Sequence, residues 1–323
     1  MGKVVENEKA INLLKNLCEI ESPSKKETAI KCFVKDYLLH LGYEVVESDY
    51  FLFVKNDSDL IVATHLDTVP VKRKFSTDGN FAYGTGVCDA KGSLTAILLA
   101  AESRVAWNMA FFCDEEEDGL GSREFLSVNT SANKVIVMEP TELKIASRHW
   151  GSFELILKVI GEEAHGAFPE VGKNAIELVF EVFHELKKLD LKINTLKIMG
   201  GGEEYIIPKE CEVKFEVFLK PEEKLKEVVK RLDFLKHYGK VEVDHAYEGY
   251  QSQGVEKVLE QALSSVGITP EWTEMKSWTD ALNLKERFDV VVWGPGSLPK
   301  CHTAEEKIRI SEILEAAKVL RNL

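Results

Sequence analysis

The sequence predicts an α/β protein with a mixed, largely parallel sheet, interrupted by a smaller inserted α+β domain. Three observations carry this prediction. In residues 1–150, helical apolar spacing alternates with short, almost wholly apolar runs, which are typical of strands buried on both faces. Between residues 151 and 248, strand-like segments alternate polar and apolar residues instead. Helix–strand alternation resumes in residues 249–323, so the two outer segments are predicted to form one domain with helices on both faces of its sheet.

The outer domain begins with two expected helices. Apolar residues at positions 10, 11, 14, 17 and 18 have helical spacing, and a second helix follows from about Ile30 to Leu41 and stops at Gly42. Ser24 and Glu27 are predicted to form a capping box at its start. Strand-like runs come next, then the buried helix GSLTAILLAA, and then the buried strands WNMAFFC and NKVIVME with a short helix between them. This order predicts a layered α/β sheet.

The inserted domain, residues 151–248, shows a different order of elements. SFELILKVIG and KVEVDHA are expected strands at its two ends. Between them we expect a helix at 174–188, strands near 191–199 and 210–219, and a helix at 222–236. The order βαββαβ is the ferredoxin-like arrangement, and about a hundred residues is a normal domain size.

Composition excludes several classes of function. The charge of −13, from 41 basic and 54 acidic residues, argues against a nucleic-acid or anionic-membrane partner. No stretch approaches ~18 uninterrupted apolar residues, so no transmembrane helix is expected. The start MGKVVENEKA lacks the apolar region of a signal peptide, and the six cysteines include no CxxC pair. We therefore expect a cytoplasmic protein with reduced thiols.

Residues that can bind metal fall at the carboxyl ends of the predicted strands. His65 and Asp67 end the run LIVATHLD and, being two apart on an extended chain, point to the same side. An aspartate there can accept the second N–H of a metal-binding histidine. Glu139 ends NKVIVME, and His302 follows the last strand by a loop. Because ligands bind at this edge of an open α/β sheet, the clustering favours a metal site over simple polar strand ends.

Two further acidic features lie at the same edge. Asp89 sits in the Gly-rich loop GTGVCDAKGS, where a helix N-cap is the alternative role. The loop lacks both GxGxxG and GxxxxGKS spacing, so a nucleotide site is not expected. The five acids of residues 114–118 begin where WNMAFFC ends. A charge run alone is more typical of a solvated face, and only its position suggests otherwise.

Together these segments resemble the M20 metallopeptidase and amidohydrolase family, which includes acetylornithine deacetylase, succinyl-diaminopimelate desuccinylase, aminoacylases, carboxypeptidases and dipeptidases. The resemblance covers nearly the whole chain in the family's order. The segments that carry it are SPSKKE (22–27), HLDTVP (65–70), YGTGVCDAKGS (83–93), DEEEDGLGS (114–122), MEPT (138–141), GEEAHGAFPEVGKNAI (161–176) and GPGSLPKCHTAEE (294–306). It implies a zinc-exopeptidase-like fold in which the inserted domain is a lid and a dimer interface.

The resemblance also implies two divalent metal ions. His65, Asp89 and Glu139 would hold one ion, and Asp89, Glu116 and His302 would hold the other, with Asp89 shared. Imidazole and carboxylate ligands suit Zn²⁺, which we expect, as well as Co²⁺ or Mn²⁺. Three protein ligands per ion leave room for water, as in a catalytic site rather than a structural one.

Three more residues receive roles from the resemblance. Glu115 would be the general base, taking a proton from the water between the ions and passing it to the leaving amine. Asp67 would orient His65, and the Asp89–Ala90 peptide bond would be cis. His165, in the inserted domain, would stabilise the oxyanion, often from the partner subunit of a homodimer. A surface histidine on a loop is its alternative.

Some positions depart from the family pattern or stay open. Tyr205 and Phe218 stand where many relatives have a lid asparagine and arginine. Arg148, Lys276 and Lys300 are the candidates to meet a substrate carboxylate.

Three cysteines flank the predicted site. Cys88, Cys113 and Cys301 each directly precede a site residue or the acidic run. Thiolate ligation is conceivable, but we favour small buried residues that fill the sheet edge. Either way, the thiols could make the protein sensitive to oxidation.

The sequence therefore predicts a dinuclear metal-dependent hydrolase of amide bonds. The expected substrates are N-acyl amino acids of the acetylornithine or acetyl-lysine type, and the expected partner is a second copy of the chain. A dipeptidase or carboxypeptidase with the same metal chemistry is the alternative. A non-catalytic relative that binds metal or a small ligand is a further one, which the filled ligand and base positions disfavour.

Overall fold

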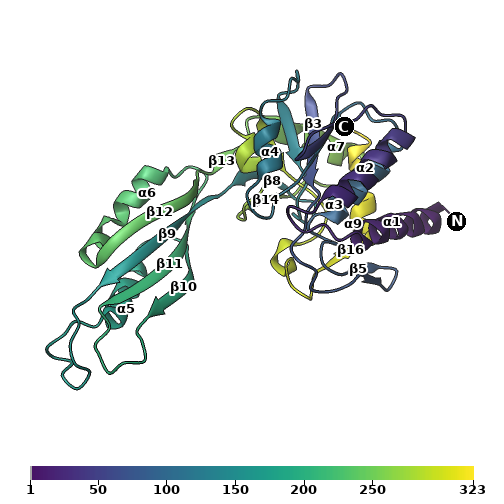
Figure 1. The fold of residues 1–323 in the computed structure, drawn as a ribbon. Coiled ribbons are helices and arrows are strands. Elements are labelled where there is room, and N and C mark those ends of the chain that lie inside the picture. The colour runs from purple at the N-terminus through teal and green to yellow at the C-terminus, as the bar shows by residue number, and fades with distance from the viewer. Residues whose placement is uncertain (1) are drawn as a thin grey trace. The chain divides into compact units, whose positions relative to one another are not determined.

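The computed structural model describes residues 2–323, which form two compact units. The first unit is the chain up to Arg148 together with Ser252–Leu323, and the second is His149–Gln251. Each unit has its own hydrophobic core. The first is α/β and the second α+β, which confirms the predicted fold class (Figure 1). No helix in residues 2–323 is both long enough and apolar enough to cross a membrane.

The central sheet of the first unit is mixed, with a parallel middle. Its strands lie in the order β1–β2–β6–β3–β7–β15–β8, with β14 beside β8. The pairs β6–β3, β3–β7 and β7–β15 are parallel, whereas β1, β2 and β8 pair antiparallel with their neighbours. The strands are β1 (Val46–Glu47), β2 (Phe51–Val54), β3 (Leu60–His65), β6 (Asn108–Phe112), β7 (Lys134–Val137), β8 (Ile145–His149), β14 (Trp272–Met275) and β15 (Asp289–Val292).

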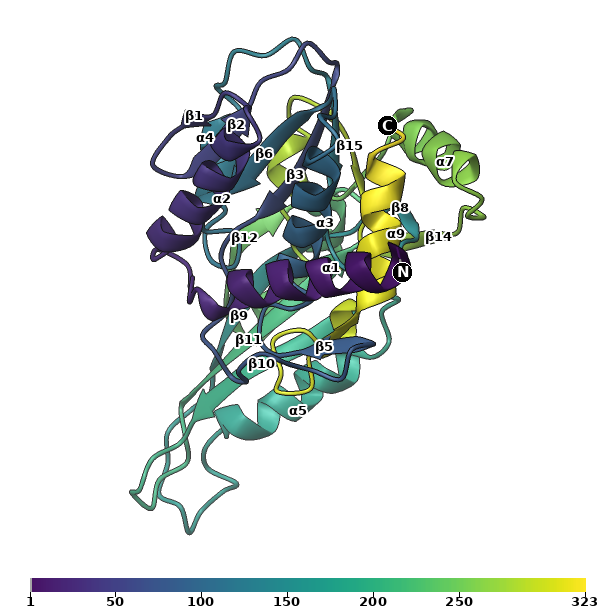
Figure 2. The ribbon, with the colours of Figure 1, turned by 90° about the vertical axis from the view of Figure 1, so that its right-hand side faces the viewer.

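Helices cover both faces of this sheet because its strands are apolar on both sides. On one face, side chains such as Leu52 and Phe111 share a buried cluster with residues of α1, α2, α3, α7 and α9. On the other face, Phe51 and Phe112 pack edge-on against Phe125 of α4. Figure 2 shows α1, α3 and α9 packed together over the sheet. The helices are α1 (Gly2–Glu19), α2 (Thr28–His40), α3 (Lys91–Ala101), α4 (Leu120–Phe125), α7 (Val255–Ser265), α8 (Ala281–Leu284) and α9 (Ile310–Leu320).

A small antiparallel sheet joins two loops that are far apart in the sequence. It consists of β16 (Lys307–Arg309), β5 (Phe81–Tyr83) and β4 (Ser76–Thr77) in that order. The N–H of Gly84 donates to the carbonyl of Glu306, which extends this pairing. The short 3₁₀ helix η2 (Leu298–Lys300) leads into the same region. As a result, the segment before Asp89 lies beside the segment that follows His302.

The second unit is a four-stranded antiparallel sheet with helices on one face, in the strand order β10–β11–β9–β12. Residues of β9 and β11 alternate between buried and partly exposed positions, as the sequence pattern predicts. Its elements are β9 (Gly151–Ile160), α5 (Ala175–Leu186), β10 (Ile193–Gly200), β11 (Glu210–Leu219), α6 (Leu225–Arg231), η1 (Asp233–His237), β12 (Gly239–Tyr247) and β13 (Tyr250–Gln251).

One predicted element of this unit is wrong in detail. The sequence predicts a continuous helix over 222–236, but α6 ends at Arg231 and the 3₁₀ helix η1 follows. Leu232 and Leu235 are both buried, and their spacing of three places both on the inner side of a 3₁₀ turn. Packing against the sheet therefore overrides the helical pattern in this segment.

Candidate metal centre

Three neighbouring parallel strands end at the same edge of the first unit's sheet. His65 is the last residue of β3 and lies in register with Phe112, the last residue of β6. Ala63 of β3 pairs with Val137, the last residue of β7. One residue separates the acidic run from the end of β6, and one separates Glu139 from the end of β7, so Glu115, Glu116 and Glu139 gather around His65.

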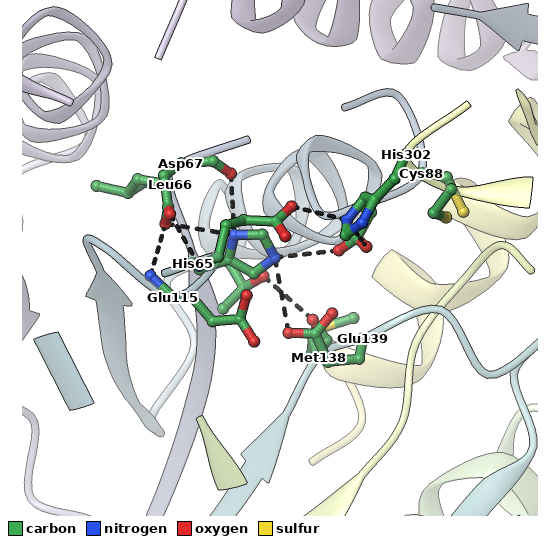
Figure 3. Close-up of polar contacts among 12 residues, drawn as sticks. His65, Leu66, Asp67, Cys88, Glu115, Met138, Glu139 and His302 are labelled. Carbon is green, nitrogen blue, oxygen red and sulfur yellow. Dashed lines mark hydrogen bonds and ion pairs between the residues drawn. The ribbon is translucent and has the colours of Figure 1, made fainter. Parts of the chain in front are cut away.

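The first cluster contains His65, Asp89 and Glu139, all of which are buried. The Nε2 atom of His65 lies 3.1 Å from Oδ1 of Asp89 and 3.7 Å from Oε1 of Glu139 (Figure 3). Their ligand atoms lie within 4.8 Å of one another. Within residues 2–323, Oε1 of Glu139 has no hydrogen-bond partner, which is costly for a buried carboxylate oxygen.

The second cluster shares Asp89 with the first. Nε2 of His302 lies 3.2 Å from Oδ2 of Asp89 and 3.0 Å from Oε1 of Glu116. Asp89 therefore directs one oxygen toward His65 and the other toward His302, as a bridging carboxylate would. The Asp89–Ala90 peptide bond that follows is cis.

The tautomer of His65 tests whether these residues fit a metal ion. Its Nδ1 lies 2.9 Å from the backbone carbonyl oxygen of Asp67, which can only accept a hydrogen bond. The proton of the neutral ring therefore sits on Nδ1, and the Nε2 lone pair faces the carboxylates of Asp89 and Glu139. A lone pair facing carboxylates is repulsive unless a proton on Nε2 or a metal cation lies between them. The donor set of two imidazoles and three carboxylates thus fits divalent ions.

The charges of the cluster lead to the same conclusion. Burial raises the pKa of Glu115 and of Glu139 well above the ordinary value of a glutamate. Burial opposes protonation of His65, yet the carboxylates of Glu139 and Glu115 raise its pKa well above the ordinary value. Hydrogen bonds to Asp89 and Glu116 raise the pKa of His302 to about 10. The glutamate shifts reflect mainly burial, and the histidine shifts reflect the carboxylates around them, whose negative charge bound cations would offset.

Asp67 holds the acidic run in place. Its Oδ1 accepts the N–H of Glu115 at 3.1 Å, and its Oδ2 accepts the N–H of Glu116 at 3.0 Å. Both the carboxylate and the carbonyl of Asp67 lie near the second ring nitrogen of His65. The carboxylate lies 3.5 Å from Nδ1, and the shorter contact is made by the Asp67 carbonyl. The backbone amides of the acidic run are close enough to donate to both carboxylate oxygens of Asp67.

The predicted capping box is wrong for a related reason. The Ser24 hydroxyl donates to Oδ2 of Asp67 at 2.7 Å instead of capping α2. Oε1 of Glu27 accepts the backbone N–H of Asp114 at 2.9 Å, so it supports the start of the acidic run. Both side chains bind partners that are distant in the sequence, and Oε1 of Glu27 also accepts the nearby N–H of Lys25 at 2.9 Å.

Sequence reasoning missed two other supports of the site. Buried Glu306 accepts the backbone N–H groups of Cys88 and Asp89 through Oε1, at 3.0 and 3.3 Å. The indole N–H of Trp278 donates to the carbonyl of Glu115 at 3.1 Å. The signal for Glu306 was present in the motif CHTAEE, but nothing local indicates which amides it would meet.

The five acids of the run occupy different environments. Glu115 is buried and Glu116 partly buried, whereas Glu117 and Asp118 are exposed and pair with Lys25 at 2.6 and 3.2 Å. Asp114 is buried in a left-handed conformation with φ of 64°, and its carbonyl accepts the N–H of Gly119. The run is therefore a tight turn that sends successive side chains in different directions.

A cavity of about 190 Å³ opens onto this cluster. The residues that line it all belong to the first unit: Asp89, Glu115, Glu116, Glu139, Met275, Ser277, Trp278, Thr279, Leu298 and His302. An adjoining pocket of about 530 Å³ shares Met275, Ser277 and Leu298 with it. The cluster thus has a partly apolar space beside it in which a small ligand could lie.

Other residues singled out in the sequence lie elsewhere. His165 belongs to the second unit, where it is exposed and its Nδ1 accepts the N–H of Ala167 at 3.2 Å. Tyr205 is 89% exposed, and the ammonium of Lys192 lies 4.0 Å from the ring centre of Phe218.

The candidate partners for a substrate carboxylate also have contacts of their own. Arg148 pairs with Glu274 at 2.8 Å, and Lys300 pairs with Glu305 at 2.6 Å. Lys276 lines the adjoining pocket.

An α/β sheet with imidazoles and carboxylates that could hold divalent ions gathered at its carboxyl edge is the arrangement expected of a metal-dependent hydrolase. The sequence matches the model of peptidase family M20/M25/M40 over residues 61–323, and the chain belongs to this family. The family assignment confirms the resemblance and shows that the protein is an enzyme of the hydrolase and peptidase type.

Similar proteins agree with this assignment. A [LysW]-lysine/[LysW]-ornithine hydrolase of Saccharolobus islandicus is 27% identical, over 98% of this chain and 95% of that protein. A tripeptidase of Staphylococcus aureus shares the fold with a TM-score of 0.86 at 20% identity, over 98% of this chain and 97% of that one. A dinuclear metal-binding M20 peptidase of Bacillus subtilis has a TM-score of 0.77 at 14% identity, over 98% and 97% of the two chains.

Proposed function

We propose that the protein is a dinuclear metal-dependent hydrolase that removes the acyl group from an N-acyl amino acid. The observation that carries the proposal is the geometry of Asp89, whose two oxygens face two separate ligand clusters. The B. subtilis structure described as dinuclear supports it from a second direction.

His65, Asp89 and Glu139 would hold one ion, and Asp89, Glu116 and His302 the other. Zn²⁺ is the ion we propose, with Co²⁺ or Mn²⁺ as substitutes. When bound, such ions polarise the substrate carbonyl and make water a better nucleophile at neutral pH.

Glu115 is the proposed general base. It lines the cavity beside both clusters and is buried, and its backbone is held at both ends of the residue. Asp67 accepts its N–H, and Trp278 donates to its carbonyl. Burial raises the pKa of its carboxyl, which suits a group that takes a proton from the attacking water. The same proton then goes to the departing amine nitrogen, so one water adds across the amide bond.

The cavity supports a small substrate group. Met275, Trp278 and Leu298 add apolar surface to a lining that also contains the carboxylates, and the volume of about 190 Å³ suits a short acyl chain. The S. islandicus relative is named as a hydrolase of lysine and ornithine conjugates, which favours a basic amino acid as the released product. A dipeptidase or carboxypeptidase is the second candidate, favoured by the likeness to the tripeptidase structure.

We also propose that the enzyme is a homodimer formed through the second unit. Strand β10 is the edge of that sheet, and its exposed side chains include Leu196, Ile198 and Met199. Phe180 on α5 is also exposed. An exposed edge strand with apolar side chains is a ready site for pairing with another chain.

In such a dimer His165 would assist the oxyanion, and a mixture of His165→Ala and Glu115→Gln chains would regain activity. A strictly monomeric, active enzyme would reject this role.

The reaction is tested with a panel of acetyl-amino acids, dipeptides and tripeptides in the presence of Zn²⁺, Co²⁺ or Mn²⁺. We expect turnover of acetylornithine or acetyl-lysine, and loss of about 10²–10⁴-fold in Glu115→Gln. Glu117→Gln, in the same turn but exposed, is the matched control and should retain activity. If no substrate in the panel is hydrolysed with any of the metals, the proposal fails.

The ligand set has its own test in the metal content. Elemental analysis should find about two ions per chain in the wild type and fewer in His302→Ala. Unchanged metal content in His302→Ala would remove that residue from the proposal.

We propose a cytoplasmic location on the ground that all six cysteines are free thiols.

A further inference from the structure

Two buried cysteines share one hydrogen-bond acceptor beside the metal centre. The thiols of Cys88 and Cys301 both point at the carbonyl oxygen of Ser297, with Sγ–O distances of 3.8 Å for Cys88 and 3.6 Å for Cys301. Two thiols that share one acceptor form a neighbouring pair, although they come from distant parts of the sequence.

The packing around the pair holds the sulfur atoms in place. A Cβ atom added to Gly296 would lie 2.3 Å from Sγ of Cys88, so the backbone of Gly296 packs directly against this sulfur. Cys88 is fully buried and Cys301 is 8% exposed, next to the exposed side chain of His302. Figure 3 shows Cys88 beside His302. A small oxidant can therefore reach the pair from the side of Cys301, the more exposed of the two thiols.

The pair is attached to two of the candidate ligands. Cys88 directly precedes Asp89, and Cys301 directly precedes His302. These two ligand side chains lie 3.2 Å apart and belong to the second cluster. Any movement of the two sulfur atoms toward each other is thus passed on to the cluster through one peptide unit on each side.

Cys113 provides a comparison within the same region. It is buried and precedes the acidic run, but its charged neighbours are Glu27, Lys31, Asp67 and Asp280. Among residues 2–323, Cys113 shares no hydrogen-bond acceptor with a second thiol, whereas Cys88 and Cys301 share the carbonyl of Ser297. Position beside the metal centre is therefore common to three cysteines, while the shared acceptor distinguishes Cys88 and Cys301.

We propose that Cys88 and Cys301 are a modification site, which a peroxide closes to a disulfide that loosens the second ion cluster. One thiol sulfur attacks a peroxide oxygen and becomes a sulfenic acid as the O–O bond breaks and water leaves. The other thiol attacks that sulfur, the S–S bond forms and a second water leaves. Two electrons pass from the sulfur atoms to the peroxide, so two thiols and one hydrogen peroxide give one disulfide and two waters.

The effect on the cluster follows from the precision that metal sites need. Metal–ligand distances tolerate changes of only about 0.2 Å. Drawing these two sulfur atoms together into a covalent bond is expected to move the backbones that carry Asp89 and His302 by more than this. The cluster of Asp89, Glu116 and His302 is therefore expected to lose its ion first, since two of its three ligands follow the cysteines directly.

The experiment treats the zinc-loaded protein with hydrogen peroxide and scores the cross-link by mass spectrometry of a non-reduced tryptic digest. The diagnostic product joins peptides 75–91 and 301–307, which contain Cys88 and Cys301. Zinc is measured after removal of the peroxide, before and after dithiothreitol. All chains carry Cys32→Ser, because Cys32 is exposed and would cross-link between molecules.

We expect the linked peptides to appear over minutes to hours, since buried thiols react slowly. We expect retained zinc to fall by about half, the share of one ion in two, and to return after reduction and addition of zinc. Cys301→Ser should give no link and keep its zinc, while Cys113→Ser, the matched control, should behave like its parent.

Absence of the 75–91/301–307 product overturns the proposal, as does a link that leaves zinc unchanged. The inference rests on the proposed metal clusters for its effect but not for the cross-link. If the unoxidised protein holds no zinc, the proposed function fails, and the peptide product still decides whether the two cysteines are a modification site.

Discussion

Asp280 gives the most direct test of the electrostatics behind the candidate site. Its side chain is fully buried at the start of α8. Burial is the main cause that raises its pKa from 3.8 to about 7, and the carboxylates of Asp67 and Asp114 add to the rise. The change we consider is Asp280→Asn, which keeps the shape of the side chain and removes its charge.

The sign and size of the effect follow from proton linkage. Between the unfolded pKa near 3.9 and the folded pKa of about 7, the folded protein keeps a proton that the unfolded chain has released. The wild type therefore loses stability as the pH rises through this range, by up to 1.36 kcal/mol per pH unit and about 4 kcal/mol in all. Asp280→Asn lacks this loss, so its stability relative to wild type should rise by about 4 kcal/mol between pH 4 and pH 8.

The assay is urea unfolding of metal-free protein at several pH values, followed by tryptophan fluorescence. Four of the five tryptophans, at positions 107, 272, 278 and 293, belong to the first unit, so the signal reports mainly on the unit that contains Asp280. Metal-free protein is used because bound cations would lower the pKa of a nearby acid. Asp36→Asn, on the exposed side of α2, is the control. Stability curves of wild type and Asp280→Asn that stay parallel from pH 4 to pH 8 would refute the reasoning.

Three further outcomes are expected. Glu306→Ala leaves two buried amides of the Gly-rich loop without an acceptor, so we expect a loss of about 1–3 kcal/mol in urea unfolding and a lower zinc content by elemental analysis. The control Glu305→Ala changes the exposed neighbouring residue and should alter neither the unfolding free energy nor the zinc content. Phe125→Ala removes a ring that contacts four other aromatic rings and should cost about 3–5 kcal/mol of unfolding free energy. Chelation should speed amide hydrogen exchange in residues 114–118 before it does so in the core strands, and uniform exchange rates would contradict this.

The fold was predictable because its two units bury their strands differently. Strands β3 and β6 are covered on both faces, so their apolar runs are continuous. Strands β9 and β11 are covered on one face, so their residues alternate. The break between α6 and η1 was not predictable, because it depends on how Leu232 and Leu235 meet the sheet rather than on local spacing.

The positions of the candidate ligands were also accessible from sequence, but their supports were not. Parallel strands in register bring their carboxyl ends together, so residues at those ends become neighbours whatever separates them along the chain. Hydrogen bonds between loops follow no such rule. The contact of Ser24 with Asp67 spans 43 residues, that of Glu27 with Asp114 spans 87, and that of Glu306 with Cys88 spans 218. Local patterns instead predicted a capping box, in which Ser24 and Glu27 would bind each other's backbone amides rather than distant partners.

The acidic run shows how such long-range contacts turn a repulsive sequence into a functional turn. Two of its backbone amides, those of Glu115 and Glu116, are fixed by the two oxygens of one carboxylate, Asp67. The Asp67 carbonyl meanwhile fixes the ring of His65. One residue therefore sets the orientation of the proposed base and of a candidate ligand in each cluster. The base and the ligands share one rigid support, so a disturbance of Asp67 would reach the proton transfer and the ion binding together.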